Sequence, residues 1–265
     1  RSMGSGFCVS SNGFILTNRH VAAGWLAPYP LPPGILVEPV FDEKGKIADW
    51  KEVGAVSQPP TNWVPARAKL LGGKPISGKW LEGKSIYLDV TFAKNKNRIP
   101  AKLAAISPNH DVAMIKIDMP SSVDQVELYD NYHEVRAGQP VTVMGYPGLS
   151  PKTGVGELSG DASRRYELVV VPDPTVTPGS IGKVLRGTRS LAAGEQDSNY
   201  WSAIGDYYQL TANTGPGNSG GPVFDDRGRV IGIFTAQIMD RAGTKVTFAV
   251  PIRYGLELMS TRPVF

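Results

Sequence analysis

The hexapeptide Gly217-Asn218-Ser219-Gly220-Gly221-Pro222 is the most informative stretch of this 265-residue chain. A serine flanked by glycines can sit on a tight turn with its hydroxyl exposed, and glycine lets neighbouring backbone N–H groups converge on one point. Acyl transfer needs such a pairing of nucleophile and oxyanion site. Taken alone the stretch is ambiguous. It satisfies the nucleophile-elbow pattern G-x-S-x-G, and it is also typical of an ordinary glycine-rich turn.

The order of histidines and acidic residues around Ser219 separates the candidate classes. The three histidines are His20, His110 and His133, and none follows Ser219, which excludes the α/β-hydrolase order. No acidic residue precedes Glu38, so His20 lacks the upstream aspartate of the subtilisin order. The remaining order, His then Asp then Ser, is that of the chymotrypsin fold.

Asp111 supplies the acidic member of that order. His20 stands where an apolar run ends and a turn of small residues begins, and Asp111 opens the alternating run 111–118. A buried carboxylate at a strand start can hold an imidazole in one tautomer and stabilise its charged form. We expect the neighbouring His110 to point to the opposite face of that strand. His133 lies in a polar stretch, where we expect it to be exposed.

The pattern along the rest of the chain predicts an all-β fold. Short apolar alternations recur between glycines and prolines, as in sandwiches and barrels. Hairpin signals stand at Ser11-Asn12-Gly13 and Asp225-Asp226-Arg227-Gly228. Only 251–261, which begins at Pro251, is typical of a helix. The predicted core strands are 5–9, 13–17, 85–92, 99–106, 111–118, 140–145, 166–171, 181–189, 207–212, 229–236 and 244–250.

Residues 24–84 have a different composition. They hold nine of the 22 prolines and four of the five tryptophans, with strand signals only at 35–40 and 64–71. We interpret them as a long insertion between core strands. Two hypotheses remain open: a surface excursion whose tryptophans cover a small core of its own, or an element that binds a regulatory partner. The four tryptophans are Trp25, Trp50, Trp63 and Trp80.

The composition restricts the kinds of ligand and partner that we expect this chain to bind. The 28 basic and 24 acidic residues give a net charge of +4, and no Lys/Arg run reaches five, so nucleic-acid binding is not expected. Cys8 is the one cysteine, which excludes an internal disulfide and a thiolate metal site. Its apolar neighbours predict a buried structural thiol. We expect no metal and no cofactor.

Seven stretches together resemble the HtrA/DegP branch of the trypsin-like serine proteases. The resemblance covers roughly 1–20 and 85–258 and leaves the insertion outside. It implies two six-stranded antiparallel β-barrels, about 1–120 and about 135–250, with the active site between them and a C-terminal helix at 251–261. The stretches are Gly4–Phe7, Leu16–Val21, His110–Ile117, Val143–Pro147, Val176–Gly179, Gly217–Pro222 and Phe248–Pro251.

The sequence departs from that family in ways that restrict what the resemblance implies. His20 and Asp111 stand 91 positions apart (111 − 20), more than in typical members. The stretch that resembles the family is the protease domain without a PDZ domain, so trimer formation and PDZ-controlled activation are not inferred. The family favours the cell envelope or secretion, with protein or peptide substrates. The oligomeric state is not predicted.

The predicted function is hydrolysis of peptide bonds by a serine endopeptidase. Ser219 is the expected nucleophile, and the backbone N–H groups of Gly217 and Ser219 are the expected oxyanion donors. His20 is the base that Asp111 orients. The alternative is a non-catalytic protease fold used for binding or scaffolding. A narrower hypothesis is a protease that rests inactive until a partner or peptide binds.

The expected specificity pocket lies beside Ser219. Counting back six residues places Asn213 at the pocket base, where an aspartate would select Lys or Arg. Because Asn213 is uncharged and the walls are narrow, we expect a small or medium apolar residue before the cut. The expected walls are Phe234, Thr235 and Ala236 on one side, and Val246, Thr247 and Phe248 on the other.

Overall fold

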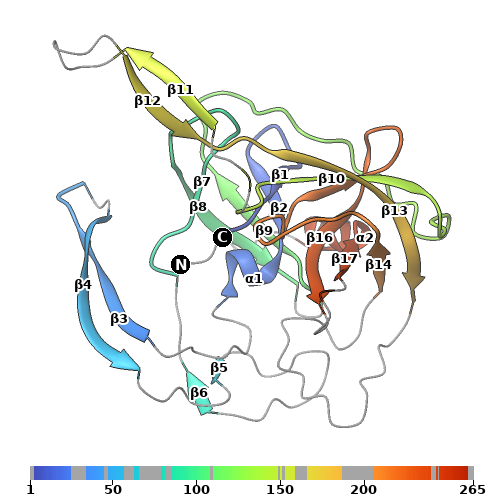
Figure 1. Cartoon of the computed structure of the whole chain (residues 1–265), viewed down its shortest axis with the longest axis horizontal. Coiled ribbons are helices and arrows are strands. Elements are labelled where there is room, and N and C mark those ends of the chain that lie inside the picture. Colours follow the sequence, from blue (N-terminus) through green and yellow to red (C-terminus); the bar gives the residue numbers. More distant parts are fainter. Residues whose placement is uncertain are drawn as a thin grey trace.

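The computed structural model describes residues 3–24, 34–44, 47–56, 63–65, 79–81, 85–107, 110–148, 150, 153–158, 166–186, 206–239, 243 and 245–261. Strands predominate in these residues. They are accompanied by two helices, α1 (Arg19–Ala22) and α2 (Arg253–Ser260). The helix expected near the end of the chain is α2. Figure 1 shows two strand-rich halves side by side, and α2 packs against both of them.

The second half is a closed barrel of six antiparallel strands, as the family resemblance implied. Alternate residues of these strands, among them Val143, Ile181, Tyr208 and Phe234, fill its core. The predicted hairpin at 225–228 joins two of its strands, and Gly228 there has a φ of 77°. In spatial order the strands are β10 (Pro140–Gly145), β13 (Thr175–Leu185), β14 (Tyr207–Leu210), β17 (Lys245–Pro251), β16 (Val230–Met239) and β15 (Pro222–Phe224).

The first half differs from the predicted closed six-stranded barrel. The described residues form a five-stranded sheet, in the order β1-β2-β9-β8-β7, that is not closed. Its two edge strands are only two residues long, too short to carry the ladder that closure needs. The predicted hairpin at 11–13 is present, with Gly13 at a φ of 95°. The strands are β1 (Phe7–Cys8), β2 (Phe14–Thr17), β7 (Asp89–Val90), β8 (Ile99–Ile106) and β9 (Ala113–Ile117).

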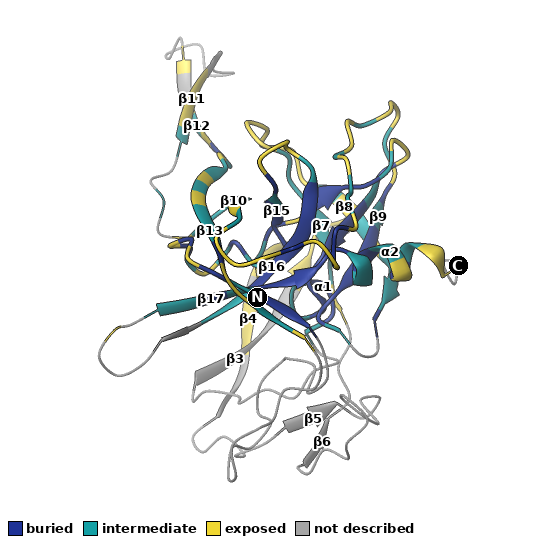
Figure 2. Ribbon diagram, turned by 90° about the vertical axis from the view of Figure 1, so that its right-hand side faces the viewer, coloured by how far each residue is buried: buried dark blue, intermediate teal, exposed yellow. Residues whose placement is uncertain are grey.

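One apolar core joins the two halves. Leu16 and Met114 from the first sheet pack in the same cluster as Ile233 and Val250 of the barrel. Leu258 of α2 belongs to that cluster too. Figure 2 shows the buried residues gathered where the strands of both halves meet. Because the halves share this core, side chains from both are held in fixed relation at the junction.

The insertion contributes two small strand pairs. β3 (Gly34–Phe41) pairs antiparallel with β4 (Ile47–Val56), and β5 (Trp63–Pro65) pairs parallel with β6 (Lys79–Leu81). The strand predicted at 35–40 is confirmed within β3, whereas β4 was not predicted. The tryptophan side chains on which the packing hypothesis depends lie outside what the structure describes.

A hairpin arm leaves the barrel between β10 and β13. It consists of β11 (Thr153–Leu158) and β12 (Tyr166–Val171), and it projects from the body of the molecule (Figure 1). The sequence predicted β12 but missed β11, because Gly154 and Gly156 lower its strand propensity. Leu168 of β12 lies against Gly154, where an added Cβ would meet its side chain.

Candidate active site

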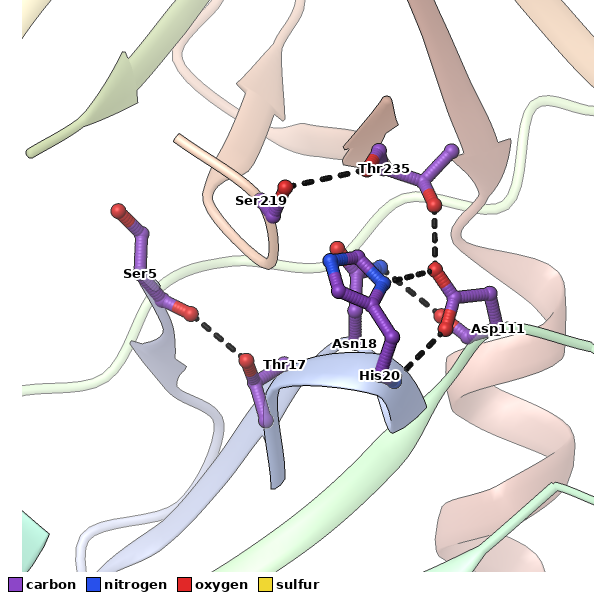
Figure 3. A network of polar contacts seen from close by, with 7 residues as sticks. All are labelled: Ser5, Thr17, Asn18, His20, Asp111, Ser219 and Thr235. Atoms are coloured by element: carbon purple, nitrogen blue, oxygen red, sulfur yellow. Dashed lines mark hydrogen bonds and ion pairs between the residues drawn. The ribbon is translucent and has the colours of Figure 1, made fainter. Parts of the chain in front are cut away.

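Segments from both halves bring the three predicted side chains together. His20 lies on α1, directly after β2, and Asp111 lies just before β9, which pairs antiparallel with β2. Ser219 lies on the glycine-rich turn that leads into β15. Figure 3 shows the ring of His20 between Asp111 and Ser219. The 91-residue separation between His20 and Asp111 therefore does not keep them apart in space.

The carboxylate of Asp111 is buried and surrounded by donors. Its Oδ2 atom lies 2.7 Å from Nδ1 of His20, and its Oδ1 atom accepts the backbone N–H of His20 at 3.0 Å. The hydroxyl of Thr235 also donates to Oδ2. Asp111 is 2% exposed. A carboxylate this deeply buried needs such charge-assisted bonds, and the bond at Nδ1 fixes the tautomer of His20.

The two groups shift each other's pKa. Burial lowers the pKa of His20, but the negative charge of Asp111 and its hydrogen bond outweigh burial, so the pKa of His20 lies above its ordinary value. Burial raises the pKa of Asp111, but the charge and hydrogen bond of His20 and the bond from Thr235 outweigh it, so the pKa of Asp111 lies below its ordinary value. Asp111 is therefore ionised at neutral pH.

Ser219 is tied to this pair through Thr235. The Ser219 hydroxyl donates to the carbonyl oxygen of Thr235 at 3.1 Å, while the Thr235 side chain donates to Asp111 (Figure 3). A hydroxyl has one proton, so transfer to His20 requires that proton to turn from Thr235 towards the imidazole. Hydrogen bonds between nucleophile and base are commonly completed only when substrate binds.

A β-bulge explains the position of Thr235. On strands β16 and β17, Phe234 pairs with Ala249 and Ala236 pairs with Phe248, which leaves Thr235 as the extra residue. Bulges next to active sites re-aim a side chain. Here Phe234 packs in the barrel core, while the hydroxyl of Thr235 reaches Asp111. The sequence placed both residues in the pocket wall and missed this contact.

The turn that carries Ser219 depends on two left-handed glycines. Gly217 has a φ of 102° and Gly220 a φ of 87°. A Cβ on Gly217 would overlap the carbonyl oxygen of Tyr146, and one on Gly220 would overlap that of Ser5. Both positions therefore require glycine for conformation and for space.

Ser5, from the first half, holds the same turn in place. Its backbone N–H donates to the Ser219 carbonyl at 2.7 Å, and its hydroxyl donates to the Gly217 carbonyl at 2.7 Å. The Ser5 hydroxyl also accepts the N–H of Tyr146 at 3.0 Å. Within the described part of the chain, the N–H groups of Gly217 and Ser219 donate to no protein acceptor, which suits the predicted oxyanion site.

Supporting residues next to the histidine were missed by sequence reasoning. The side-chain amide of Asn18 donates to the backbone carbonyl of Asp111 at 2.8 Å, and the Thr17 hydroxyl donates to the Ser5 carbonyl at 2.7 Å (Figure 3). The sequence did contain a signal for these residues. Thr17 and Asn18 lie just before His20, and Ser5 lies in Gly4–Phe7, the first of the stretches that resemble the protease family. Their short polar side chains were not expected to bridge distant segments.

The other two histidines lie elsewhere. His110 stacks on Tyr254 of α2 with ring centroids 3.5 Å apart, and burial lowers the pKa of His110 to about 4. It thus contacts α2, whereas the next residue, Asp111, contacts His20. His133 is exposed, as expected. Cys8 is a buried free thiol, as expected.

The residues predicted to line the specificity pocket differ in how far they are buried. Asn213 is exposed and accepts a hydrogen bond from the ammonium group of Lys245 at 3.3 Å. Thr247 is buried and donates to the carbonyls of the segment before Asn213. The register places Gln237 opposite Thr247. The bulge at Thr235 shifts this register, so the expected wall residues did not include Gln237.

The described residues offer neither a metal cluster nor a membrane-spanning helix. No group of three or more His, Cys, Asp or Glu side chains in the described ranges is arranged to hold a metal ion. No helix within the same ranges combines the length and apolar character needed to cross a membrane.

The closed barrel and the half-barrel meet near His20, Asp111 and Ser219, and this architecture agrees with a chymotrypsin-like fold. The chain belongs to the trypsin-like peptidase domain family, whose sequence pattern matches residues 4–233. A curated relative, "Probable periplasmic serine endoprotease DegP-like" of Brucella suis biovar 1 (strain 1330), is 32% identical over 154 residues. That match covers 58% of this chain and 24% of the relative.

Relatives that match more of the chain at lower identity carry the same description or belong to the same type of protease. The protein of the same description from Pseudomonas putida (strain ATCC 700007 / DSM 6899 / JCM 31910 / BCRC 17059 / LMG 24140 / F1) is 23% identical over 261 residues, which are 97% of this chain and 34% of that protein. Solved structures of "HtrA-type protease AlgW" with a tripeptide and with a decapeptide both have a TM-score of 0.52. They are 23% and 22% identical, and cover 98% of this chain and 55% and 51% of theirs. The resemblance to the HtrA/DegP branch is thereby confirmed.

Proposed function

We propose that this chain hydrolyses peptide bonds in protein or peptide substrates through an acyl-enzyme. Ser219 attacks the carbonyl carbon, and His20 takes its proton and later donates it to the leaving amine. Asp111 orients His20 and stabilises the imidazolium. The backbone N–H groups of Gly217 and Ser219 stabilise the developing oxyanion.

The contact between His20 and Asp111 carries the proposal. The 2.7 Å separation fixes Nδ1 on the carboxylate and leaves Nε2 as the ring atom that receives the serine proton. His20 has a side chain 24% exposed, so a bound substrate can reach it. Burying the charge of Asp111 is costly, and the hydrogen bonds from His20 and Thr235 offset that cost.

Replacement of the nucleophile tests this function. Ser219→Ala should abolish casein cleavage, because removing one member of a triad typically costs several orders of magnitude in rate. Its fold should persist, since only the Oγ bond to Thr235 is lost. Circular dichroism checks that fold. Casein cleavage by Ser219→Ala at the wild-type rate would show that the nucleophile has been assigned wrongly.

The hydrogen bond from Ser219 to Thr235 supports the narrower hypothesis of a resting state. In that state the hydroxyl is held on a backbone carbonyl until substrate turns it towards His20. A peptide that binds away from the cleft and stabilises the turned hydroxyl should then raise the rate at which a second, reporter peptide is cut. A reporter rate that only falls as the first peptide is added, as in simple competition, would contradict this activation.

A further inference from the structure

Two segments expected to line the specificity pocket, 212–214 and the strand that carries Thr247, meet at the carbonyl group of Ala212. The hydroxyl of Thr247 lies within hydrogen-bonding distance of two carbonyl oxygens, that of Leu210 at 3.0 Å and that of Ala212 at 3.1 Å. The backbone N–H of Thr214 donates to the same Ala212 oxygen at 3.0 Å. Thr247 in turn lies opposite Gln237 on the paired strands β17 and β16. Residues paired in this way have side chains on the same face of a sheet. Thr214, Thr247 and Gln237 thus belong to one compact group beside the Ser219 turn.

Two polar atoms of this group are buried without a hydrogen bond. They are Oγ1 of Thr214, whose residue is 2% exposed, and Oε1 of Gln237. Neither has a partner among the residues that the structure describes. Buried polar atoms are normally satisfied, because leaving them unpaired costs stability. Thr214 adjoins Asn213 at the expected pocket base and Gln237 lies opposite the expected wall residue Thr247, which points to a group of the substrate as the missing partner.

We propose that the pocket selects a small hydroxyl-bearing residue, threonine or serine, immediately before the cut. This inference rests on the proposed peptidase function and specifies its substrate. A hydroxyl matches the two atoms because it donates and accepts at once. It can donate to Oε1 of Gln237 and accept the proton of the Thr214 hydroxyl. A valine of the same shape would leave both atoms unpaired.

The neighbouring groups disfavour the other side chains. Lys245 places its ammonium group on Asn213 at the expected pocket base, which repels a substrate lysine or arginine. Gln237 and Thr247 face each other where a deep pocket would need small residues, which disfavours aromatic side chains. This proposal replaces the apolar preference expected from the sequence, which was derived without Gln237 or Thr214.

A pair of isosteric peptides tests the proposal. Peptides identical except for threonine or valine before the cut should differ in kcat/KM by about tenfold or more in favour of threonine, since a site built to bind a hydroxyl rejects the analogue that lacks it. Serine should exceed alanine in the same way. Casein cleavage is measured in parallel, so that loss of peptidase activity is recognised separately from a change of preference.

Substitutions at Thr214 and Gln237 test whether their two unpaired atoms cause the preference for threonine before the cut. Thr214→Val and Gln237→Met should each reduce the ratio of threonine to valine cleavage to about twofold or less, while the valine peptide is still cut. Thr211→Val is the matched control, because its exposed hydroxyl bonds Ser180 outside the pocket, and it should keep the wild-type ratio.

Each contrary outcome is distinguishable. If wild type cuts casein but prefers valine, alanine, lysine or glutamate before the cut, the pocket proposal is wrong and the peptidase proposal stands. An unchanged ratio in both Thr214→Val and Gln237→Met also overturns it. If wild type cuts neither casein nor any peptide, the proposed function fails, and the pocket proposal fails with it.

Discussion

A single residue, Thr235, forms hydrogen bonds with two members of the proposed triad, Asp111 and Ser219. Its side chain donates to the Asp111 carboxylate, and its backbone carbonyl accepts from Ser219. The β-bulge makes both contacts possible by releasing Thr235 from the ladder of strand β16. We therefore expect Thr235 to act as a positioning residue, whose effect on the proposed reaction passes through Asp111.

Thr235→Val tests that role with an isosteric change. Hydrogen bonds to charged groups contribute about 1.5–3 kcal/mol, so the variant should lose on the order of 2 kcal/mol in its free energy of unfolding. Its kcat should fall about tenfold while KM changes little, because Asp111 holds His20 less firmly. Denaturant titration and steady-state kinetics measure the two quantities. An unaltered kcat together with unaltered stability would contradict the assignment.

The pH dependence follows from the pKa of His20. The base must be neutral to accept the serine proton, and the charge of Asp111 holds the pKa of His20 above its ordinary value despite burial. Activity should therefore be low in acid and rise through an apparent pKa above about 6.5. Asp111→Asn should shift this apparent pKa downward. A kcat/KM profile that is flat from about pH 5 to about pH 9 would contradict a histidine base.

At the scale of elements, the turn that carries Ser219 has the strictest requirement for glycine. Gly220→Ala would place a Cβ on the Ser5 carbonyl, at a φ that alanine disfavours. We expect this variant to lose most of its peptidase activity, because the turn must move Ser219 to relieve the overlap.

Gly228→Ala is the matched control for that change. Gly228 also has a positive φ, 77°, but nothing lies within 4 Å of an added Cβ. It should lose about 1 kcal/mol of stability through backbone strain alone and retain its activity. Peptidase assays and thermal unfolding compare the two variants. Equal activity losses in both would mean that strain, and not the position of Ser219, decides the outcome.

The sequence was informative where short-range chemistry sets the structure. Turn residues predicted the hairpins at 11–13 and 225–228, and alternation predicted β10, β14, β16 and β17 and the second part of β13 but missed β15. Features that depend on pairing were missed. A bulge cannot be read from residue types, so neither the contact of Thr235 with Asp111 nor Gln237 opposite Thr247 could be predicted.

At the scale of the whole molecule, the site depends on the junction of two unequal halves. The barrel is closed, whereas the first sheet is open in the described residues, yet both contribute to one core. The His-Asp-Ser order predicted which class of fold brings these groups together. It did not predict the open sheet, because barrel closure depends on strand lengths and stagger that composition does not define.

The insertion at 24–84 gives a prediction at this scale. If it forms a packed element on the first half, limited proteolysis should cut it no faster than the surface loops of the barrel. Four tryptophans, each with about 150–250 Å² to bury, are costly to leave in water. Mass spectrometry of a trypsin time course follows the cleavage. Rapid removal of 24–84 with full retention of activity would instead show a loose appendage.

The central claim, that Ser219 is a nucleophile activated by His20, is tested most directly with a serine-reactive phosphonate probe, followed by intact and peptide mass spectrometry. The measurement is made with and without a substrate peptide, so that a resting conformation cannot conceal the serine. We predict one adduct per chain, located on Ser219, that is absent from Ser219→Ala and strongly slowed in His20→Ala. An unlabelled wild type under both conditions, or an adduct that persists in Ser219→Ala, would contradict the account.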